Sequence, residues 1–352
     1  MDVTFFSQLL VSGILLGGIY ALASIGLTLI FGVMKIVNFA HGEFFMIAMY
    51  LTFWLFHYFH IDPYLGTLIL VPVIFLIGVM TYYIFIKPTM SSSVLCQIFI
   101  TVGLSTIIQN AVLLFWSADF RSISLKYATD SIVFGAYPSL SVGEIMVNPA
   151  RLIAFVLAIS LSIGFYLFLK FSYTGKIIRA TSQDRSAALL MGINIDKVYK
   201  LTFAIGIVLV GLAGGLVLPI YTVHPFVGFD FVLIMFVVVV LGGMGSVVGA
   251  MISGFIIGIV EVFSSYWIGQ ESKQAIYFLV FIAVLVVRPS GLFGLKECRC
   301  IGTDPEKGIM SQRYHPCISS KDVPCSSKRS PDENQNESIK IKVIFDQQGQ
   351  NT

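Results

Sequence analysis

The chain has 352 residues, of which 57% are hydrophobic and only 12% are charged, and its formal net charge is +3. Soluble domains carry about twice that share of charged residues, so the composition excludes an ordinary soluble protein. The charges are also unevenly placed, because residues 296–352 hold 17 of the 41 charged side chains. We therefore expect residues 1–295 to form an all-α polytopic membrane domain and residues 296–352 to form a polar tail.

A membrane-spanning helix needs about 20 mostly apolar residues, and eight segments approach or exceed that requirement. In chain order they are Leu9–Phe31, Phe39–Phe59, Leu65–Ile86, Val94–Trp116, Leu152–Phe171, Leu201–Tyr221, Phe231–Trp267 and Ala275–Val287. The seventh segment is too long for one simple span, and glycines interrupt it. Residues 231–267 are therefore expected to cross the membrane either as one broken helix or as two shorter ones. The prediction is about eight or nine membrane segments.

A polar block lies at the start of the second segment, where Asn38, His41, Gly42 and Glu43 follow one another closely. Ionisable side chains are costly where they face lipid, so His41 and Glu43 should face a cavity, a neighbouring helix or water. The block is then either a gate or hinge at the mouth of a pathway, or an interfacial cluster that marks a helix end.

Three further polar side chains fall inside predicted spans, namely Gln109, Asn110 and Glu261. An ionisable group at a span centre costs roughly 2.5–3.5 kcal/mol on insertion scales, which the apolar neighbours of Glu261 only just offset. We expect these side chains to face the protein interior. They either line a pathway or make structural hydrogen bonds between helices.

A basic, polar segment from Lys170 to Lys200 interrupts the apolar runs, with six basic and two acidic residues. Because basic loops remain on the cytoplasmic side, this loop should be cytoplasmic. Counting back through five spans places the N-terminus outside, and the tail lies inside if residues 231–267 cross twice. Within the loop, Ser186–Met191 is expected to form a short helix after Asp184 and Arg185, ended by Gly192. Such a helix could dock on a partner, or the loop could be an ordinary solvated one.

Glycines at positions 242, 243 and 245 break the seventh segment. Breaks of this kind can expose backbone groups to a transport pathway, and small residues can also serve close helix packing. Both interpretations stay open from the sequence.

The sequence excludes several kinds of chemistry. It contains no Gly-x-x-x-x-Gly-Lys-Ser/Thr loop for ATP, no His-Glu-x-x-His zinc motif and no Gly-x-Ser-x-Gly elbow. We therefore expect no enzyme activity, no bound cofactor and no metal site, and no nucleic-acid partner. Transport remains, with its energy supplied by another chain, by an ion gradient or by the gradient of the solute.

Several motifs resemble those of the permease subunits of branched-chain amino-acid ABC importers, the LivH type. They cover residues 5–295 in order: Gly17–Leu22, Gly26–Gly32, Asn38–Glu43, Gly175–Asn194, Gly242–Ser246 and Arg288–Gly294. The Asn38–Glu43 block and the 175–194 loop are specific, whereas the glycine-rich match alone would be weak.

The resemblance implies a permease that works by alternating access in the bacterial inner membrane. It implies two ABC ATPase subunits, which use the ATP, a periplasmic solute-binding protein, and a second permease subunit of LivM type or a copy of this chain. Residues 172–200 would be the ATPase-coupling loop, with the coupling residues Arg179, Asp184, Arg185, Ala187, Ala188 and Gly192. Ser186 stands where the broader importer pattern has glutamate, which removes one expected charge contact.

Two alternatives remain: a urea or short-amide importer permease with the same pattern, and an ion-coupled secondary transporter, for which Glu261 is the credible carboxylate. In the tail, Cys298, Cys300, Cys317 and Cys325 match no standard zinc spacing. The tail is polar and Ser-rich, and we expect it to be disordered.

Overall fold

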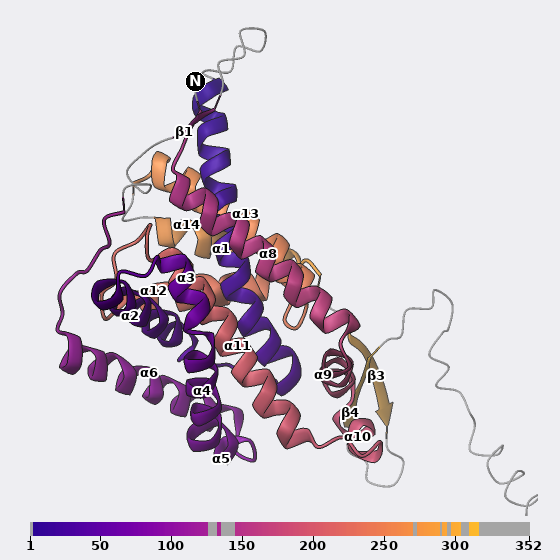
Figure 1. Cartoon of the computed structure of the whole chain (residues 1–352). Coiled ribbons are helices and arrows are strands. Elements are labelled where there is room, and N and C mark those ends of the chain that lie inside the picture. The colour runs from indigo at the N-terminus through magenta and orange to yellow at the C-terminus, as the bar shows by residue number, and fades with distance from the viewer. Residues whose placement is uncertain are drawn as a thin grey trace, which may run out of the picture. The chain divides into compact units, whose positions relative to one another are not determined.

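The computed structural model of the chain describes residues 3–125, 132–134, 145–269, 273–288, 291–293, 297–303 and 310–316 (Figure 1). It divides into two units, residues 1–294 and 295–352, with a boundary one residue from the expected one. The helices of the first unit are α1 (Val3–Met34), α2 (His41–Phe59), α3 (Pro63–Ile69), α4 (Val71–Thr81), the π-helix η1 (Tyr82–Ile86), α5 (Lys87–Thr89), α6 (Val94–Trp116), α8 (Pro149–Phe171), α9 (Tyr173–Gln183), α10 (Arg185–Leu190), α11 (Ile195–Val217), α12 (Val227–Gly242), α13 (Val247–Trp267) and α14 (Lys273–Val287).

Six of the helical stretches in the described part of the chain are long and apolar enough to cross a membrane. A seventh span arises if α2 and α3, which meet at a bend of 115°, are counted as one broken crossing. The helices α12 and α14 are also apolar but shorter. The chain is thus an all-α polytopic membrane protein, with one short antiparallel strand pair, β1 (Ile132–Phe134) and β2 (Ile145–Val147), in the connection before α8.

The predicted span Leu65–Ile86 was wrong in its first part. Its first residues belong to α3, which starts at Pro63 after the side chain of Asp62 caps its backbone. The chain turns at Leu70, and the spanning stretch of this region is Val71–Thr89. A proline at the first helical position and an aspartate before it are strong helix-start signals, so a new helix begins here instead of continuing α2.

Two other boundaries also differ from those expected. The predicted span Leu201–Tyr221 is α11, which begins six residues earlier because Asn194 caps it through the Lys197 amide. Residues 231–267 form two helices, α12 and α13, which Gly243 and Gly245 separate with φ angles of +95° each. Glycine adopts this left-handed backbone without the steric cost that other residues meet, so the glycine-rich segment is a turn between two helices.

The helix α1 lies at the centre of the first unit and packs against α13, α11, α8 and α12 (Figure 1). It runs antiparallel to α13, since Gly13 lies against Ile259 and Gly32 lies against Gly245. Small residues let the two backbones approach closely, which is the common way that helices associate in lipid.

The second unit contains one antiparallel strand pair, β3 (Glu297–Thr303) with β4 (Met310–Pro316). Within this unit the structure describes only these two segments, and the disorder expected for the tail stays a prediction. Cys298 and Cys300 lie on β3, whereas Cys317 and Cys325 fall outside the described residues, as does the rest of the tail.

Candidate functional site

The polar loop between α8 and α11 folds into two helices, α9 and α10. The first, α9, was not predicted, and it buries Ile178 and Thr181 while its polar side faces outward. Gly175 permits a sharp reversal after α8, because a Cβ there would lie 2.5 Å from the carbonyl oxygen of Leu169. The loop is therefore a compact helical unit held against the membrane helices.

The short helix α10 begins and ends one residue before the predicted Ser186–Met191, with the predicted residues Asp184 and Gly192 at its two ends. Asp184 accepts hydrogen bonds from the amides of Ser186 at 2.8 Å and Ala187 at 3.1 Å. At the other end Gly192 has a φ of +79°, and the Ile193 amide donates to the Ala188 carbonyl. This pairing is the Schellman arrangement that ends helices at glycine, so α10 is defined at both ends by its own sequence.

The outer surface of α10 is apolar, and the sequence analysis did not predict this surface. Leu189, Leu190 and Met191 are 53%, 89% and 82% exposed, respectively. Ala187 is also exposed, whereas Ala188 is buried against the rest of the chain. The sequence did contain a signal for this exposed surface, namely the run of three large apolar residues before Gly192. A six-residue helix can bury only one side, so some of these side chains had to be exposed. This exposed surface, Leu189–Met191, is here called the α10 patch.

The two arginines of the predicted coupling loop lie beside this unit. Arg179 donates to the Lys170 carbonyl at 3.2 Å, which ties α9 back to the end of α8. The guanidinium of Arg185 lies 5.6 Å from the centre of the Tyr199 ring on α11. Arg179 also lines a cavity of about 280 Å³, together with Ser182 of α9 and residues 245–248 of the α12–α13 turn. The structure thus brings the coupling loop next to the glycine turn.

The predicted block Asn38–Glu43 lies inside the protein. Asn38, His41 and Glu43 are 1%, 0% and 0% exposed. The Asn38 side chain accepts a hydrogen bond from the Ala40 amide and so fixes the turn that leads into α2. The first turn of α2 is therefore buried among other helices, and these polar side chains do not meet lipid.

Glu43 binds the neighbouring helix α6. Its Oε1 atom accepts hydrogen bonds from Ser105 at 2.9 Å and from Gln109 at 2.7 Å. Gln97, Thr101, Ser105 and Gln109 recur every four residues, so they form one polar stripe on α6. Gln97 and Thr101 in turn donate to backbone carbonyls of residues 89, 92 and 37. The polar stripe attaches α6 to the rest of the protein, while Val94, Leu95, Phe99, Val102, Ile107, Leu114 and Phe115 of the same helix are exposed.

The expectation that Asn110 is buried was wrong. It lies one residue beyond Gln109, a rotation of about 100° around the helix, and it is exposed. Its amide donates to the Thr106 carbonyl of its own helix at 2.8 Å. Only one of two adjacent helical positions can face Glu43, and Gln109 occupies it.

Two pairs of glycines make backbone contacts between helices, one between α2 and α12 and one between α1 and α11. A Cβ at Gly42 would lie 2.0 Å from the Gly228 carbonyl oxygen, and a Cβ at Gly228 would lie 2.7 Å from that of Gly42. Gly26 and Gly206 make the same reciprocal approach at 2.4 and 2.9 Å. Gly42 is therefore required for packing at the start of α2.

The glycines 242, 243 and 245 also serve close packing. A Cβ at Gly242 would lie 2.5 Å from the carbonyl carbon of Gly249, and one at Gly245 would lie 3.3 Å from Gly32. The amides of Leu292 and Phe293 donate to the carbonyls of Leu241 and Gly242. These bonds satisfy backbone groups that the end of α12 would otherwise leave unpaired.

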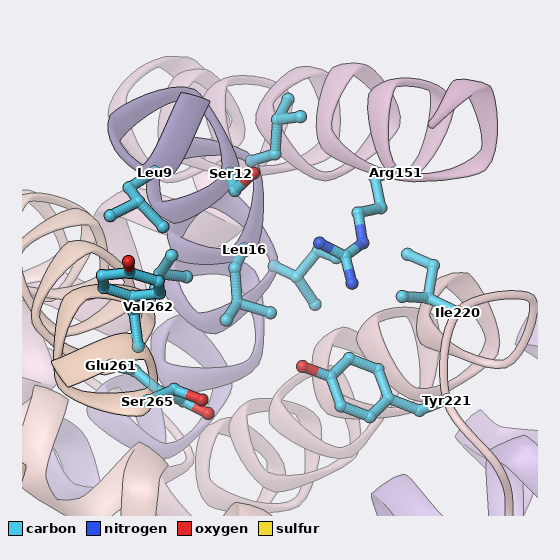
Figure 2. Close-up of a pocket in the computed structure, with 12 residues that line it drawn as sticks. Leu9, Ser12, Leu16, Arg151, Ile220, Tyr221, Glu261, Val262 and Ser265 are labelled. Carbon is cyan, nitrogen blue, oxygen red and sulfur yellow. The ribbon is translucent and has the colours of Figure 1, made fainter. Parts of the chain in front are cut away.

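Glu261 lies apart from these groups, on α13. It is 3% exposed and lines a cavity of about 480 Å³ together with residues of α1, α8 and the segment after α11 (Figure 2). The described residues contain no cluster of three or more His, Cys, Asp or Glu side chains that could hold a metal ion.

The fold and these sites define a class: a multi-pass α-helical membrane protein with a compact, exposed helix–turn unit between two spans. Residues 9–285 match the family described as branched-chain amino acid transport system, permease component, and the chain belongs to that family.

Its relatives are similar along most of their length. The chain is 31% identical to the high-affinity branched-chain amino acid transport system permease protein LivH of Salmonella typhimurium, over 83% of this chain and 97% of the relative. It is 30% identical to BraD of Pseudomonas aeruginosa, over 84% and 98%. A probable LivH of Methanocaldococcus jannaschii is 26% identical over 82% and 92%. No solved structure matches the chain.

Proposed function

We propose that this chain is the membrane permease of an ATP-driven importer that moves branched-chain amino acids across the bacterial inner membrane by alternating access. The family supports the transport role, and the names of the relatives support this class of substrate. Urea or a short amide is the alternative substrate within this class, and an ion-coupled carrier is the alternative mechanism.

The observation that carries the ATP-driven mechanism is the α10 patch. Large apolar side chains that stay exposed on a polar loop mark a surface for a protein partner. The occupant we propose is an ABC ATPase subunit, because the chain has no ATP-binding loop of its own. The caps of α10 keep the patch in one conformation, which reduces the entropy lost on docking.

The basic loop supports the orientation. Residues 170–200 carry six basic and two acidic residues, so this end of the molecule should face the cytoplasm. The N-terminus then lies outside, and the tail lies in the cytoplasm if α12 and α13 both cross. A periplasmic binding protein would deliver substrate at the opposite end, and a second permease subunit, related or identical, would complete the membrane part.

The experiment that tests the proposal is co-purification of the tagged chain with the ATPase subunits encoded beside it, followed by leucine import in proteoliposomes. Leu190→Asn should weaken ATPase binding about tenfold, whereas the control Leu190→Met keeps the apolar surface and should leave it unchanged. Import that continues after ATP depletion, or equal ATPase binding by both variants, would contradict the proposal.

A further inference from the structure

A cavity of about 480 Å³ lies at the end of the first unit remote from α9 and α10. Its residues come from the N-terminal half of α1, the start of α8, the end of α13 and the segment that follows α11. The Gln8 side chain of α1 donates to the Met146 carbonyl just before α8, so these two helix ends share one end of the molecule. In the orientation proposed above, this end faces the periplasm.

Two opposite charges lie on different walls of this cavity. Figure 2 shows the guanidinium of Arg151 reaching in from α8, and the carboxylate of Glu261 reaching in from α13. Arg151 is at the third position of α8, whose N-terminal end is capped by Asn148. Sequence reasoning singled out Glu261 but not Arg151, because an arginine at a helix start is typical of a membrane interface.

Hydroxyl groups surround the carboxylate. Glu261 is in hydrogen-bonding contact with the hydroxyl of Tyr20, and the Tyr20 side chain in turn meets Tyr221. The Tyr221 hydroxyl also points into the cavity, as Figure 2 shows. Ser12 and Ser265 complete the polar part of the wall. The hydrogen-bonding contact with Tyr20 holds the Glu261 side chain in position, and Glu261 lines the cavity.

The remaining lining is mainly aliphatic, formed by Leu9, Leu15, Leu16, Ile19, Ile220 and Val262, and it also includes Tyr266. Polar and apolar side chains thus both line the cavity, and its volume of about 480 Å³ lies within the usual range for a small-molecule site. An α-amino acid with a branched aliphatic side chain has the matching chemistry, one carboxylate, one ammonium and one apolar part.

We propose that this cavity, between Arg151 and Glu261, is a transit site for a zwitterionic branched-chain amino acid on its way through the permease. The guanidinium binds the substrate carboxylate through paired N–H donors. The Glu261 carboxylate accepts from the substrate ammonium, and the aliphatic wall takes the side chain. Urea carries neither charge and can offer these groups only neutral hydrogen bonds, so the site favours zwitterionic amino acids over amides. This inference rests on the proposed import function.

The test uses the complete importer, with its ATPase and binding-protein subunits, in lipid nanodiscs. Leucine with a photoreactive diazirine in its side chain is added, irradiated and mapped by mass spectrometry. Labelling is expected within residues 9–19, 220–221 and 261–266 and is expected to be displaced by unlabelled leucine. Arg151→Gln and Glu261→Gln should each reduce labelling about tenfold or more, as expected for a lost hydrogen bond to a charged group.

Matched variants separate the site from general damage. Arg121→Gln removes another arginine, one that lies outside the cavity lining, and should leave labelling unchanged. Ser12→Leu fills the cavity without changing its charge and should also reduce labelling. Each variant is checked for ATPase co-purification and for ATP hydrolysis stimulated by the binding protein, which should persist.

The outcomes are distinguishable. If the wild-type chain binds no ATPase, the proposed function fails. If it imports leucine but the label maps elsewhere, or the pocket variants label normally, only the site proposal fails. Retention of a phospholipid that Arg151→Gln abolishes, with leucine labelling unchanged, would assign the cavity to lipid and would also overturn the site proposal.

Discussion

The contact between Gly42 and Gly228 leads to a quantitative prediction. A Cβ at position 42 would lie 2.0 Å from the Gly228 carbonyl oxygen, whereas ordinary contact begins at 3.4 Å. The Cβ would therefore be about 1.4 Å too close to this oxygen. A side-chain rotation cannot provide that space, because the atom in the way belongs to the backbone. The Gly42→Ala chain should therefore separate α2 from α12 and lose about 1–3 kcal/mol, the usual cost of overpacking.

The assay is the thermal unfolding midpoint of the purified chain in detergent, measured at one scan rate because such unfolding is seldom reversible. Gly103→Ala is the matched control, since nothing lies within 4 Å of its added Cβ. Alanine also favours helix by up to about 1 kcal/mol, so the control should be neutral or more stable. Equal midpoints for the two variants would refute the reasoning.

The double variant Gly42→Ala/Gly228→Ala adds a second test. Both substitutions open the same backbone contact, so their costs should not add. The double variant should lose clearly less stability than the sum of the single losses. Strict additivity would show that the two glycines act independently, against the reciprocal contact described above.

Three other changes have expected outcomes. Glu43→Ala should cost about 1–3 kcal/mol because two donors on α6 lose their acceptor, whereas Glu43→Gln keeps one acceptor and should cost less; both are measured as unfolding midpoints. Gly192→Ala places a side chain at φ +79°, so about 1–2 kcal/mol of strain should loosen α10 and weaken ATPase co-purification, while Gly164→Ala, with open space around it, should not. Lys87→Ala removes the salt bridge to Asp196 at 2.9 Å. Because both side chains are nearly half exposed, the loss of stability should be no more than about 1 kcal/mol, seen as a small decrease of the unfolding midpoint.

The sequence predicted α10 well because its determinants are local. The Asp184 cap and the Gly192 stop act within a few residues of the chain, and no distant contact competes with them. The same holds for α6, whose predicted range Val94–Trp116 is the observed one. The start of α11 was misplaced because its first turn is polar, although Asn194 carries the cap signal.

The partners of the polar side chains could not be predicted in this way. Gln109 and Asn110 are chemically alike, and only the position of Glu43 on another helix decides which of them faces inward. The role of Arg151 depends on the cavity that it enters, which three other segments form. The sequence indicated that glycines 242, 243 and 245 break the apolar segment. Their contacts with Gly32 and Gly249 could be identified only in the packed structure.

The tight reversal at Gly175 has a mechanical consequence. With no room for a Cβ between α9 and the end of α8, and with Arg179 tied to the Lys170 carbonyl, the connection contains no slack that could absorb a small displacement. A push on α10 of one or two ångströms would be transmitted to α8 and α11 almost undiminished. If α10 docks on an ATPase as proposed, inserting a few flexible residues near position 175 should uncouple the movement of α10 from α8 while leaving both helices folded.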